Sequence, residues 1–196
     1  MISAVVLAAG RSARFGELKQ LLKVGKQNLV ETVVHSFLSS SADEVVVVLG
    51  FGADEILANS EFGTARVVVN PDFEQGLGTS LKTGIEAADP DASAVIVALG
   101  DQPLLSVDTI NAIITKYSET HGPIVAPFYG RRRGNPVLFD RALFPELRKL
   151  VGDEGAKRVL RRMEENIVKV SVDDPGVVFD IDDESDYRRL LTMLKS

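Results

Sequence analysis

Residues 2–19 read Ile-Ser-Ala-Val-Val-Leu-Ala-Ala-Gly-Arg-Ser-Ala-Arg-Phe-Gly-Glu-Leu-Lys, and this stretch decides the class of fold. Its apolar beginning, residues 2–7, lacks the polar alternation of a half-exposed strand and therefore predicts a buried parallel strand. At the end of this run, small side chains let a ligand approach the backbone, and a glycine tolerates positive φ. Clustered cations beside such a turn, with its free N–H groups, predict a site for a polyanion. The small residues are Ala8, Ala9 and Gly10, and the cations are Arg11, Arg14 and Lys19.

The common phosphate-loop patterns are absent from this stretch. No Gly-Lys pair follows Gly10 at the Walker spacing, and the dinucleotide pattern Gly-x-Gly-x-x-Gly also fails there. It fails again at Gly76-Leu77-Gly78, because Leu81 occupies the place of the third glycine. The missing fingerprint opposes a dehydrogenase, and the alternative to an anion site is an ordinary turn with solvated basic residues.

The composition is that of an ordinary globular protein, with 45% hydrophobic and 26% charged residues among 196. The net charge of −6 argues against a nucleic-acid partner, because no basic excess is available to displace counterions. The chain has no cysteine, which excludes disulfides and thiolate metal sites and is consistent with a cytoplasmic location. No apolar segment has the length of a membrane span or of a signal peptide, so we expect no membrane association.

Further apolar runs of strand length alternate with helix-like segments along the chain. This alternation predicts one domain over residues 1–196, a three-layer α/β/α arrangement around a mostly parallel, Rossmann-like sheet. Such sheets bind ligands beyond the carboxyl ends of their strands, where Gly10, Asn70 and Asp101 are expected. The expected strands are 44–49, 65–69, 93–99, 123–127 and 166–172, and the expected helices are 29–39, 79–88, 106–118, 142–149 and 154–164.

Residues 128–139 interrupt this rhythm. The segment Tyr129-Gly130-Arg131-Arg132-Arg133-Gly134 predicts a hairpin loop bounded by glycines. The following Pro136-Val137-Leu138-Phe139 predicts a short edge strand, because proline cannot donate to a central ladder. We expect this irregular part to cover the site from one side.

Five segments in order resemble the MobA-like nucleotidyltransferases, and the resemblance covers nearly the whole chain. Among these proteins the chain looks most like the molybdenum cofactor cytidylyltransferase branch, because it carries Ala-Ala-Gly where the guanylyl branch more often has Ala-Gly-Gly. The segments are Leu7 to Lys19, Asn70 to Ser80, Gly100-Asp101-Gln102-Pro103, Gly134 to Phe139 and Asp180-Ile181-Asp182.

The resemblance implies a nucleoside triphosphate site in the first half of the chain. Lys19 and Arg14 would grip the β- and γ-phosphates, and Lys19 is the more critical of the two in the family. Lysine acts there as a mobile point charge, whereas arginine makes bidentate phosphate contacts. The backbone of residues 7–9 and the loop near Gly76 would set the base preference. Together, the residues assigned to nucleotide binding are Leu7, Ala8, Ala9, Gly10, Arg11, Ser12, Arg14, Lys19, Asn70, Gly76, Ser80 and Asp101, of which Lys19, Arg14 and Asp101 are assigned to catalysis.

Two carboxylates are candidates for a Mg²⁺ site, since Mg²⁺ is commonly held by one or two carboxylates together with phosphate oxygens and water. Asp101 follows an apolar strand and a glycine, and its alternative role is that of a turn aspartate. The second ligand comes from the Asp180–Asp182 segment, where strand alternation would put both aspartates on one face. The family favours Asp182 and leaves Asp180 in reserve; capping of the helix that follows is the alternative role of Asp182.

The acceptor side of the site is assigned to Arg133, Asn135 and Asp153. The run of arginines at 131–133 suits an anionic pterin phosphate, and an exposed basic hairpin is the alternative. Family members usually carry Gly-His-Pro where this chain has Gly134-Asn135-Pro136, so the acceptor itself can differ.

The function implied by the resemblance is transfer of CMP from CTP to molybdopterin cofactor, with Mg²⁺ as the metal and release of pyrophosphate. A molybdoenzyme is the protein partner that such a product would serve. The alternatives are a guanylyltransferase, a sugar-phosphate nucleotidyltransferase and a non-catalytic module that delivers a cofactor. Retention of Lys19, Asp101 and Asp182 together argues against the delivery module.

Overall fold

A computed structural model describes residues 1–11 and 15–194 of the chain. Eight strands of this part form one sheet, in the order β10-β7-β9-β6-β1-β4-β5 with β8 paired to β7, and β2 and β3 form a separate hairpin. The strands are β1 (Ile2–Ala8), β2 (Lys23–Val24), β3 (Gln27–Asn28), β4 (Glu44–Leu49), β5 (Arg66–Val69), β6 (Ala94–Leu99), β7 (Ile124–Tyr129), β8 (Arg132–Arg133), β9 (Val137–Asp140) and β10 (Ile167–Ser171).

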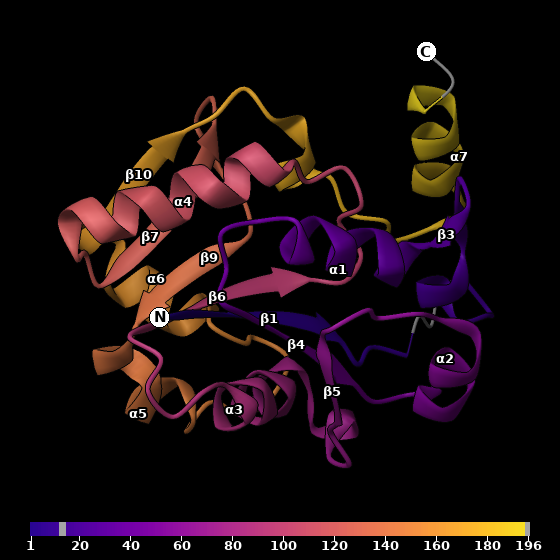
Figure 1. The fold of residues 1–196 in the computed structure, drawn as a ribbon, viewed down its shortest axis with the longest axis horizontal. Coiled ribbons are helices and arrows are strands. Elements are labelled where there is room, and N and C mark those ends of the chain that lie inside the picture. Colours follow the sequence, from indigo (N-terminus) through magenta and orange to yellow (C-terminus); the bar gives the residue numbers. More distant parts are fainter. Residues whose placement is uncertain (12–14, 195–196) are drawn as a thin grey trace.

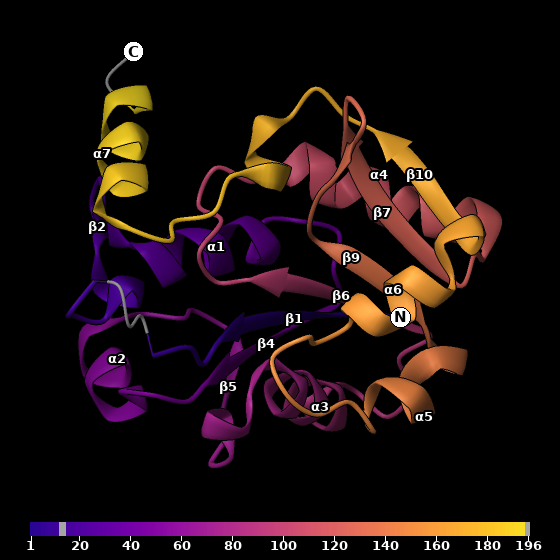
Figure 2. The ribbon, with the colours of Figure 1, turned by 180° about the vertical axis from the view of Figure 1, so that it is seen from behind.

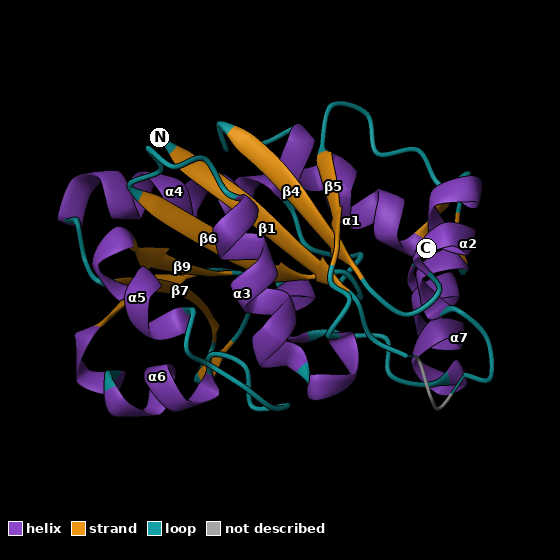
Figure 3. Ribbon diagram, turned by 90° about the horizontal axis from the view of Figure 1, so that it is seen from below, coloured by secondary structure: helices purple, strands orange, loops and turns teal. Residues whose placement is uncertain are grey.

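Helices cover both faces of this sheet, which gives the three layers visible in Figure 1. α1, α2 and α4 pack on one face, and α3, α5 and α6 pack on the other, which is the near face in Figure 3. The helices are α1 (Leu29–Leu38), α2 (Ala53–Asn59), α3 (Leu77–Ala87), α4 (Val107–Thr120), α5 (Phe144–Leu147), α6 (Lys157–Arg162) and α7 (Glu184–Met193).

β1 lies at the centre of the sheet because its side chains are buried on both faces. Ala4 and Val6 pack into the core under α1 and α4, whereas Val5 and Leu7 pack into the core under α3. β1 pairs in parallel with β4 on one side and with β6 on the other. The prediction of a buried, mostly parallel sheet is confirmed, and the expected strands agree with the observed ones to within two residues at every end.

β9 does not lie at an edge of the sheet, so the prediction made for residues 136–139 is wrong. It runs antiparallel between β6 and β7, in the middle of the sheet. The strand begins at Val137, just after Pro136, so the missing N–H of proline falls outside the ladder and leaves the pairing intact. The predicted hairpin before it is confirmed: β7 and β8 are antiparallel and the turn contains Gly130 at φ 59°.

α7 stands apart from the three layers, beside the β2–β3 hairpin (Figure 2). Leu190 of α7, Val24 of β2, Leu29 and Ile181 form a small apolar cluster that holds this helix to the body. Among the described residues, none of the helices combines the length and the apolar character that crossing a bilayer requires.

Candidate active site

A cavity of about 550 Å³ opens at the carboxyl ends of β1 and β6. It lies where open α/β sheets bind ligands, beyond the strand ends. Most of the residues that the sequence assigns to nucleotide binding meet there, although they come from four separate segments. The cavity lining includes Leu7, Ala8, Ala9, Gly10, Arg11, Lys19, Gly76, Ser80, Asp101 and Asp153.

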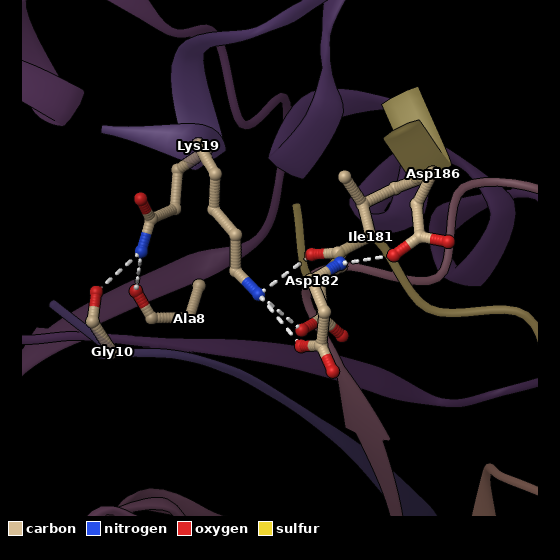
Figure 4. Close-up of polar contacts among 8 residues, drawn as sticks. Ala8, Gly10, Lys19, Ile181, Asp182 and Asp186 are labelled. Carbon is tan, nitrogen blue, oxygen red and sulfur yellow. Dashed lines mark hydrogen bonds and ion pairs between the residues drawn. The ribbon is translucent and has the colours of Figure 1, made fainter. Parts of the chain in front are cut away.

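Lys19 connects three parts of this site. Its ammonium lies 2.7 Å from Oδ2 of Asp101 and donates a 2.9 Å hydrogen bond to the carbonyl oxygen of Ile181 (Figure 4). Oδ1 of Asp182 lies 3.9 Å from the same nitrogen. The side chains of Lys19 and Asp101 are only 16% and 20% exposed, so their attraction is screened less than that of a surface pair.

Asp101 is held by close packing of two strand ends. Gly100 donates a hydrogen bond of 2.8 Å to the carbonyl of Leu7, and a Cβ at Gly100 would lie 2.8 Å from the Cβ of Ala8. With Oδ2 paired to Lys19, the other carboxylate oxygen, Oδ1, is buried and has no hydrogen-bond partner. A buried charged oxygen without a partner is costly, and a bound cation would satisfy it.

Asp180 and Asp182 flank the buried Ile181 in a segment that belongs to no strand of the sheet. One hydrogen bond, from Ile181 N to the Asp101 carbonyl at 3.0 Å, ties the segment to the end of β6. Partial burial raises the pKa of Asp180 above its ordinary 3.8, the charges of Asp101 and Asp182 raise it further, and Lys19 opposes the shift. The repulsion among these carboxylates indicates that a bound cation would stabilise the site.

The cap of α7 is Asp183, not Asp182. Its carboxylate accepts hydrogen bonds from the N–H groups of Ser185 and Asp186 at the helix start. The alternative role of Asp182 as the helix cap is therefore taken by its neighbour, and Asp182 lies beside Lys19 instead.

The residues present fit a divalent cation such as Mg²⁺ or Mn²⁺. Within the described chain, no group of three or more His, Cys, Asp and Glu side chains is gathered closely enough to hold a metal alone. Asp101 and Asp182 nevertheless lie within 4.0 Å of one ammonium, and the unpartnered Oδ1 belongs to this pair. Two carboxylates completed by phosphate oxygens and water match the usual Mg²⁺ environment.

Gln20 is a residue of the site that the sequence analysis missed. The residue is 3% exposed, and its amide nitrogen donates to the carbonyls of Ala8 at 3.2 Å and Gly10 at 2.9 Å. These bonds fix the small-residue loop after β1. A buried glutamine has no local sequence signal, and only its position next to Lys19 could have drawn attention to it.

Arg11 lies at the cavity but is paired with protein groups. It forms an ion pair with Glu74, and its guanidinium carbon lies 5.6 Å and 5.7 Å from the ring centres of Phe51 and Phe73. The other two assigned residues of this loop, Ser12 and Arg14, lie outside the described residues.

Asn70 is buried behind the cavity and does not line it. Its amide donates to the hydroxyls of Thr79 at 2.9 Å and Ser80 at 3.0 Å, and its carbonyl oxygen accepts from the N–H of Asp72. Asn70 therefore positions the first turn of α3, from which Ser80 reaches the cavity. The helix starts at Leu77 after Gly76, so Thr79 and Ser80 lie inside it and are not its caps.

Gly76 and Gly78 make close backbone approach possible, but the approach is to another part of the chain. A Cβ at Gly76 would lie 2.4 Å from the carbonyl carbon of Gly152, and one at Gly78 would lie 2.8 Å from the nitrogen of Val151. Gly78 N donates to the Gly152 carbonyl at 2.9 Å. We expected this loop to approach a nucleotide base; in the structure the approach brings the loop with Asp153 to the cavity.

The residues assigned to the acceptor are divided between two cavities. Arg133 and Asn135 line a second cavity of about 180 Å³, and Asp153 lines the first. Asn135 N donates to the Val177 carbonyl, and a Cβ at Gly134 would lie 2.4 Å from that same oxygen, so this turn is closely packed. Arg131 lines neither cavity.

Comparison with known proteins decides the family. The model of the MobA-like NTP transferase domain matches residues 4–167. The chain belongs to this family. It is therefore a nucleotidyltransferase by family, as the sequence segments predicted, and its sheet is the nucleotidyltransferase sheet.

The MobA-like chain has relatives of several names. It is 32% identical to purine catabolism protein PucB of Bacillus subtilis (strain 168), over 93% of this chain and 92% of PucB. It is 34% identical to nicotine blue oxidoreductase of Paenarthrobacter nicotinovorans, over 97% and 96%. Molybdenum cofactor cytidylyltransferase of Escherichia coli (strain K12) is more distant, at 23% identity over 95% and 93%.

Solved structures agree with the fold of this MobA-like chain. The crystal structure of the Rv0371c homolog from Mycobacterium sp. strain JC1 has a TM-score of 0.90 and 31% identity, covering 99% of this chain and 96% of its own. The structure of Rv0371C from Mycobacterium tuberculosis in complex with manganese has a TM-score of 0.84 and 29% identity, covering 97% of each chain.

Proposed function

We propose that this MobA-like protein is a Mg²⁺-dependent cytidylyltransferase that transfers CMP from CTP to the terminal phosphate of molybdopterin cofactor. The observation that carries the catalytic part is the buried Oδ1 of Asp101, which has no hydrogen-bond partner and lies beside Lys19 at the cavity. The cytidylyl specificity rests on the Ala8-Ala9-Gly10 form of the loop and on the relative from Escherichia coli.

In the proposed reaction, a phosphate oxygen of the acceptor attacks the α-phosphorus of CTP. A new P–O bond forms, the bond between the α-phosphorus and the bridging oxygen breaks, and pyrophosphate leaves with that electron pair. No protein nucleophile is needed, because the acceptor brings its own oxygen. The protein's part is to align the two substrates and to neutralise charge.

Each part of the cavity has one task in this scheme. The loop fixed by Gln20 presents the backbone of Ala8 to Gly10 to the nucleotide. Lys19 offers a cation to the triphosphate and can release Asp101 when it does so. Asp101 and Asp182 would hold the divalent ion, which withdraws negative charge from the phosphates when bound. The manganese complex of Rv0371C supports a divalent metal in a similar chain.

The test is release of pyrophosphate with Mg²⁺ and each of CTP, GTP, ATP and UTP, with and without molybdopterin cofactor. We expect release with CTP that depends on the acceptor. Asp101→Ala should abolish it, and Asp108→Ala, at the exposed start of α4, should leave it unchanged.

Release with GTP in place of CTP would support the proposed mechanism but contradict the proposed preference for cytosine. Triphosphate binding without turnover would contradict the acceptor and favour a delivery role. No binding of any triphosphate would overturn the proposed function altogether.

A further inference from the structure

A further cavity, of about 520 Å³, lies at the end of the sheet opposite to the candidate active site. It is bounded by the first residue of β5, the last turn of α3, the residues before β6 and the segment from the end of β9 to α5. α3 and α5 pack side by side on one face of the sheet (Figure 3). None of the described residues that line this cavity lines either of the two cavities above.

The end of α3 explains how two arginines come to this cavity. The helix stops at Ala87, and Pro90 cannot continue it. A helix end leaves carbonyl oxygens without partners inside the helix. Nη1 of Arg66 donates to the carbonyl of Ala87 at 2.8 Å, and Nη1 of Arg141 donates to the carbonyl of Ala92 at 2.9 Å. These bonds hold two guanidinium groups at the cavity wall.

A third arginine lines the same cavity without a backbone carbonyl to hold. Arg148 directly follows α5, and its guanidinium carbon lies 5.9 Å from the ring centre of Phe144. Among the described residues, its side chain has no hydrogen bond or ion pair. Fixing the turn after α3 accounts for Arg66 and Arg141 but not for Arg148. Three like charges around one space repel each other, so a bound anion would relieve this repulsion.

Two carboxylates also line the cavity, and they leave its charge positive. Glu86 and Asp89 form no ion pair with the three arginines within the described part of the chain. Oδ1 of Asp89 accepts a hydrogen bond of 2.7 Å from the N–H of Asp91. Three guanidinium groups against two carboxylates give a local positive excess in a chain with a net charge of −6. The cavity therefore favours an anionic occupant.

The size and the remaining walls narrow the class of anion. A volume of about 520 Å³ falls within the roughly 300–1,000 Å³ of sites for small organic molecules, so a free phosphate ion would leave much of it to water. Carbon surface from Ile85, Phe144 and Pro145 lines the rest of the cavity. The planar fork of arginine matches the oxygens of a phosphate group, to which it can donate two parallel hydrogen bonds.

We propose that this cavity binds a phosphorylated small molecule with a ring-sized carbon body, separate from the substrates of the nucleotidyl transfer. Arg66, Arg141 and Arg148 hold the phosphate dianion, and the body lies against Phe144 and Pro145. The site shares no lining residue with the first cavity, so the proposal does not rest on the proposed function.

The experiment is an NMR titration of the full chain, labelled with ¹⁵N, with phenyl phosphate as the probe. We expect the amide signals of residues 86–92 and 141–148 to shift and to give a Kd for this cavity. Signals of Gly10 and Lys19 report separately on binding in the first cavity. Benzoate, which carries one charge, should bind at residues 86–92 and 141–148 at least about threefold more weakly than the phosphate dianion.

Arg148→Gln should raise the Kd of phenyl phosphate at least about fivefold, because one charged donor is lost. Arg158→Gln is the matched control, since Arg158 is an exposed arginine of α6 that lines none of the three cavities. It should leave the Kd unchanged within about twofold. If Arg148→Gln fails to fold, Arg66→Gln is the second variant, with the same loss of affinity expected.

An unchanged Kd in the folded variants would overturn the proposal. Absence of shifts at residues 86–92 and 141–148 would do the same, as would benzoate binding as tightly as phenyl phosphate. The proposed function is decided by a different readout, the release of pyrophosphate, and stands or falls independently of this titration.

Discussion

The ammonium of Lys19 lies 2.7 Å from Oδ2 of Asp101, although 82 residues separate the two in the sequence. The same nitrogen donates to the carbonyl of Ile181, so it connects the loop after β1, the end of β6 and the segment before α7. Oδ2 of Asp101 forms this pair, whereas its Oδ1 is buried and has no hydrogen-bond partner. The pair thus joins the assigned phosphate-binding group to the assigned metal ligand.

Replacing Lys19 by glutamine should reduce the rate of pyrophosphate release by about 10²-fold, because the cavity loses the cation that lies beside Asp101 and would offset the charge of the triphosphate. The rate would be measured under saturating triphosphate and Mg²⁺. Lys23→Gln is the control, since Lys23 is an exposed lysine on β2. A rate within threefold of the wild type for Lys19→Gln would remove this residue from catalysis.

Gln20→Leu should destabilise the protein by about 2 kcal/mol and raise the Kd of the triphosphate about tenfold. The variant loses the hydrogen bonds to the carbonyls of Ala8 and Gly10, and an unsatisfied buried carbonyl costs about 1–3 kcal/mol. Urea unfolding and calorimetry give the two quantities.

Gln27→Leu serves as its comparison, because Gln27 bonds the side chain of His35 on α1 and lines neither cavity. An unchanged triphosphate affinity in Gln20→Leu would show that the loop keeps its conformation without this residue.

Gly76→Ala should cost about 2 kcal/mol more than Gly25→Ala in the free energy of unfolding. Both glycines have positive φ, at 101° and 64°, so both variants carry backbone strain. Only at Gly76 would the new Cβ overlap another segment, 2.4 Å from the carbonyl carbon of Gly152, whereas nothing lies near it at Gly25. Equal costs would mean that the loop at Gly152 moves away freely.

The raised pKa of Tyr117 predicts that the free energy of unfolding decreases above pH 10. This pKa is raised from 10.0 to about 12, mostly by burial and also by the hydrogen bond of 2.7 Å to Asp140 and the charge of that carboxylate. Above pH 10 the unfolded chain releases this proton while the folded chain retains it, so stability present below pH 10 falls until about pH 12. Each pH unit costs about 1.4 kcal/mol, or about 3 kcal/mol in all.

The measurement is urea unfolding of the wild type and of Tyr117→Phe between pH 9 and about pH 12. The phenylalanine variant should start about 1 kcal/mol less stable, because it loses a hydrogen bond, and should then lose less with rising pH. Tyr129→Phe, at an exposed tyrosine of β7, should follow the wild type. Parallel curves for the wild type and Tyr117→Phe would assign the alkaline loss to other groups.

Local sequence was sufficient for much of the fold. Strands such as β1 and β6 are continuous apolar runs buried on both faces, and their period and length are visible without tertiary information. The predicted position of β9 was wrong because a short apolar run after a proline has the same sequence pattern in an edge strand and in a central strand. The short helix α2 was missed for a similar reason, since only Ala53 and Ile56 of it are buried.

The site was predictable where its residues follow strands. The carboxyl ends of parallel strands meet at one edge, which is why Gly10 and Asp101 could be placed together from the order of elements alone. Asn70 was assigned on the same argument, but its side chain is used by Thr79 and Ser80 behind the cavity. The role of Gln20 could not be predicted from the sequence, because its hydrogen-bond partners are backbone carbonyls whose positions depend on the fold.

The sequence by itself determined the family, the parallel sheet and the edge at which the site lies, because hydrophobic period and motif order are local properties of the chain. Only the tertiary structure decided which groups touch. The pairing of Lys19 with Asp101, the unpartnered oxygen and the cavity lined by three arginines depend on strand order and on contacts across more than 80 residues. Such contacts are set by the packing of whole elements, which no single stretch of sequence specifies.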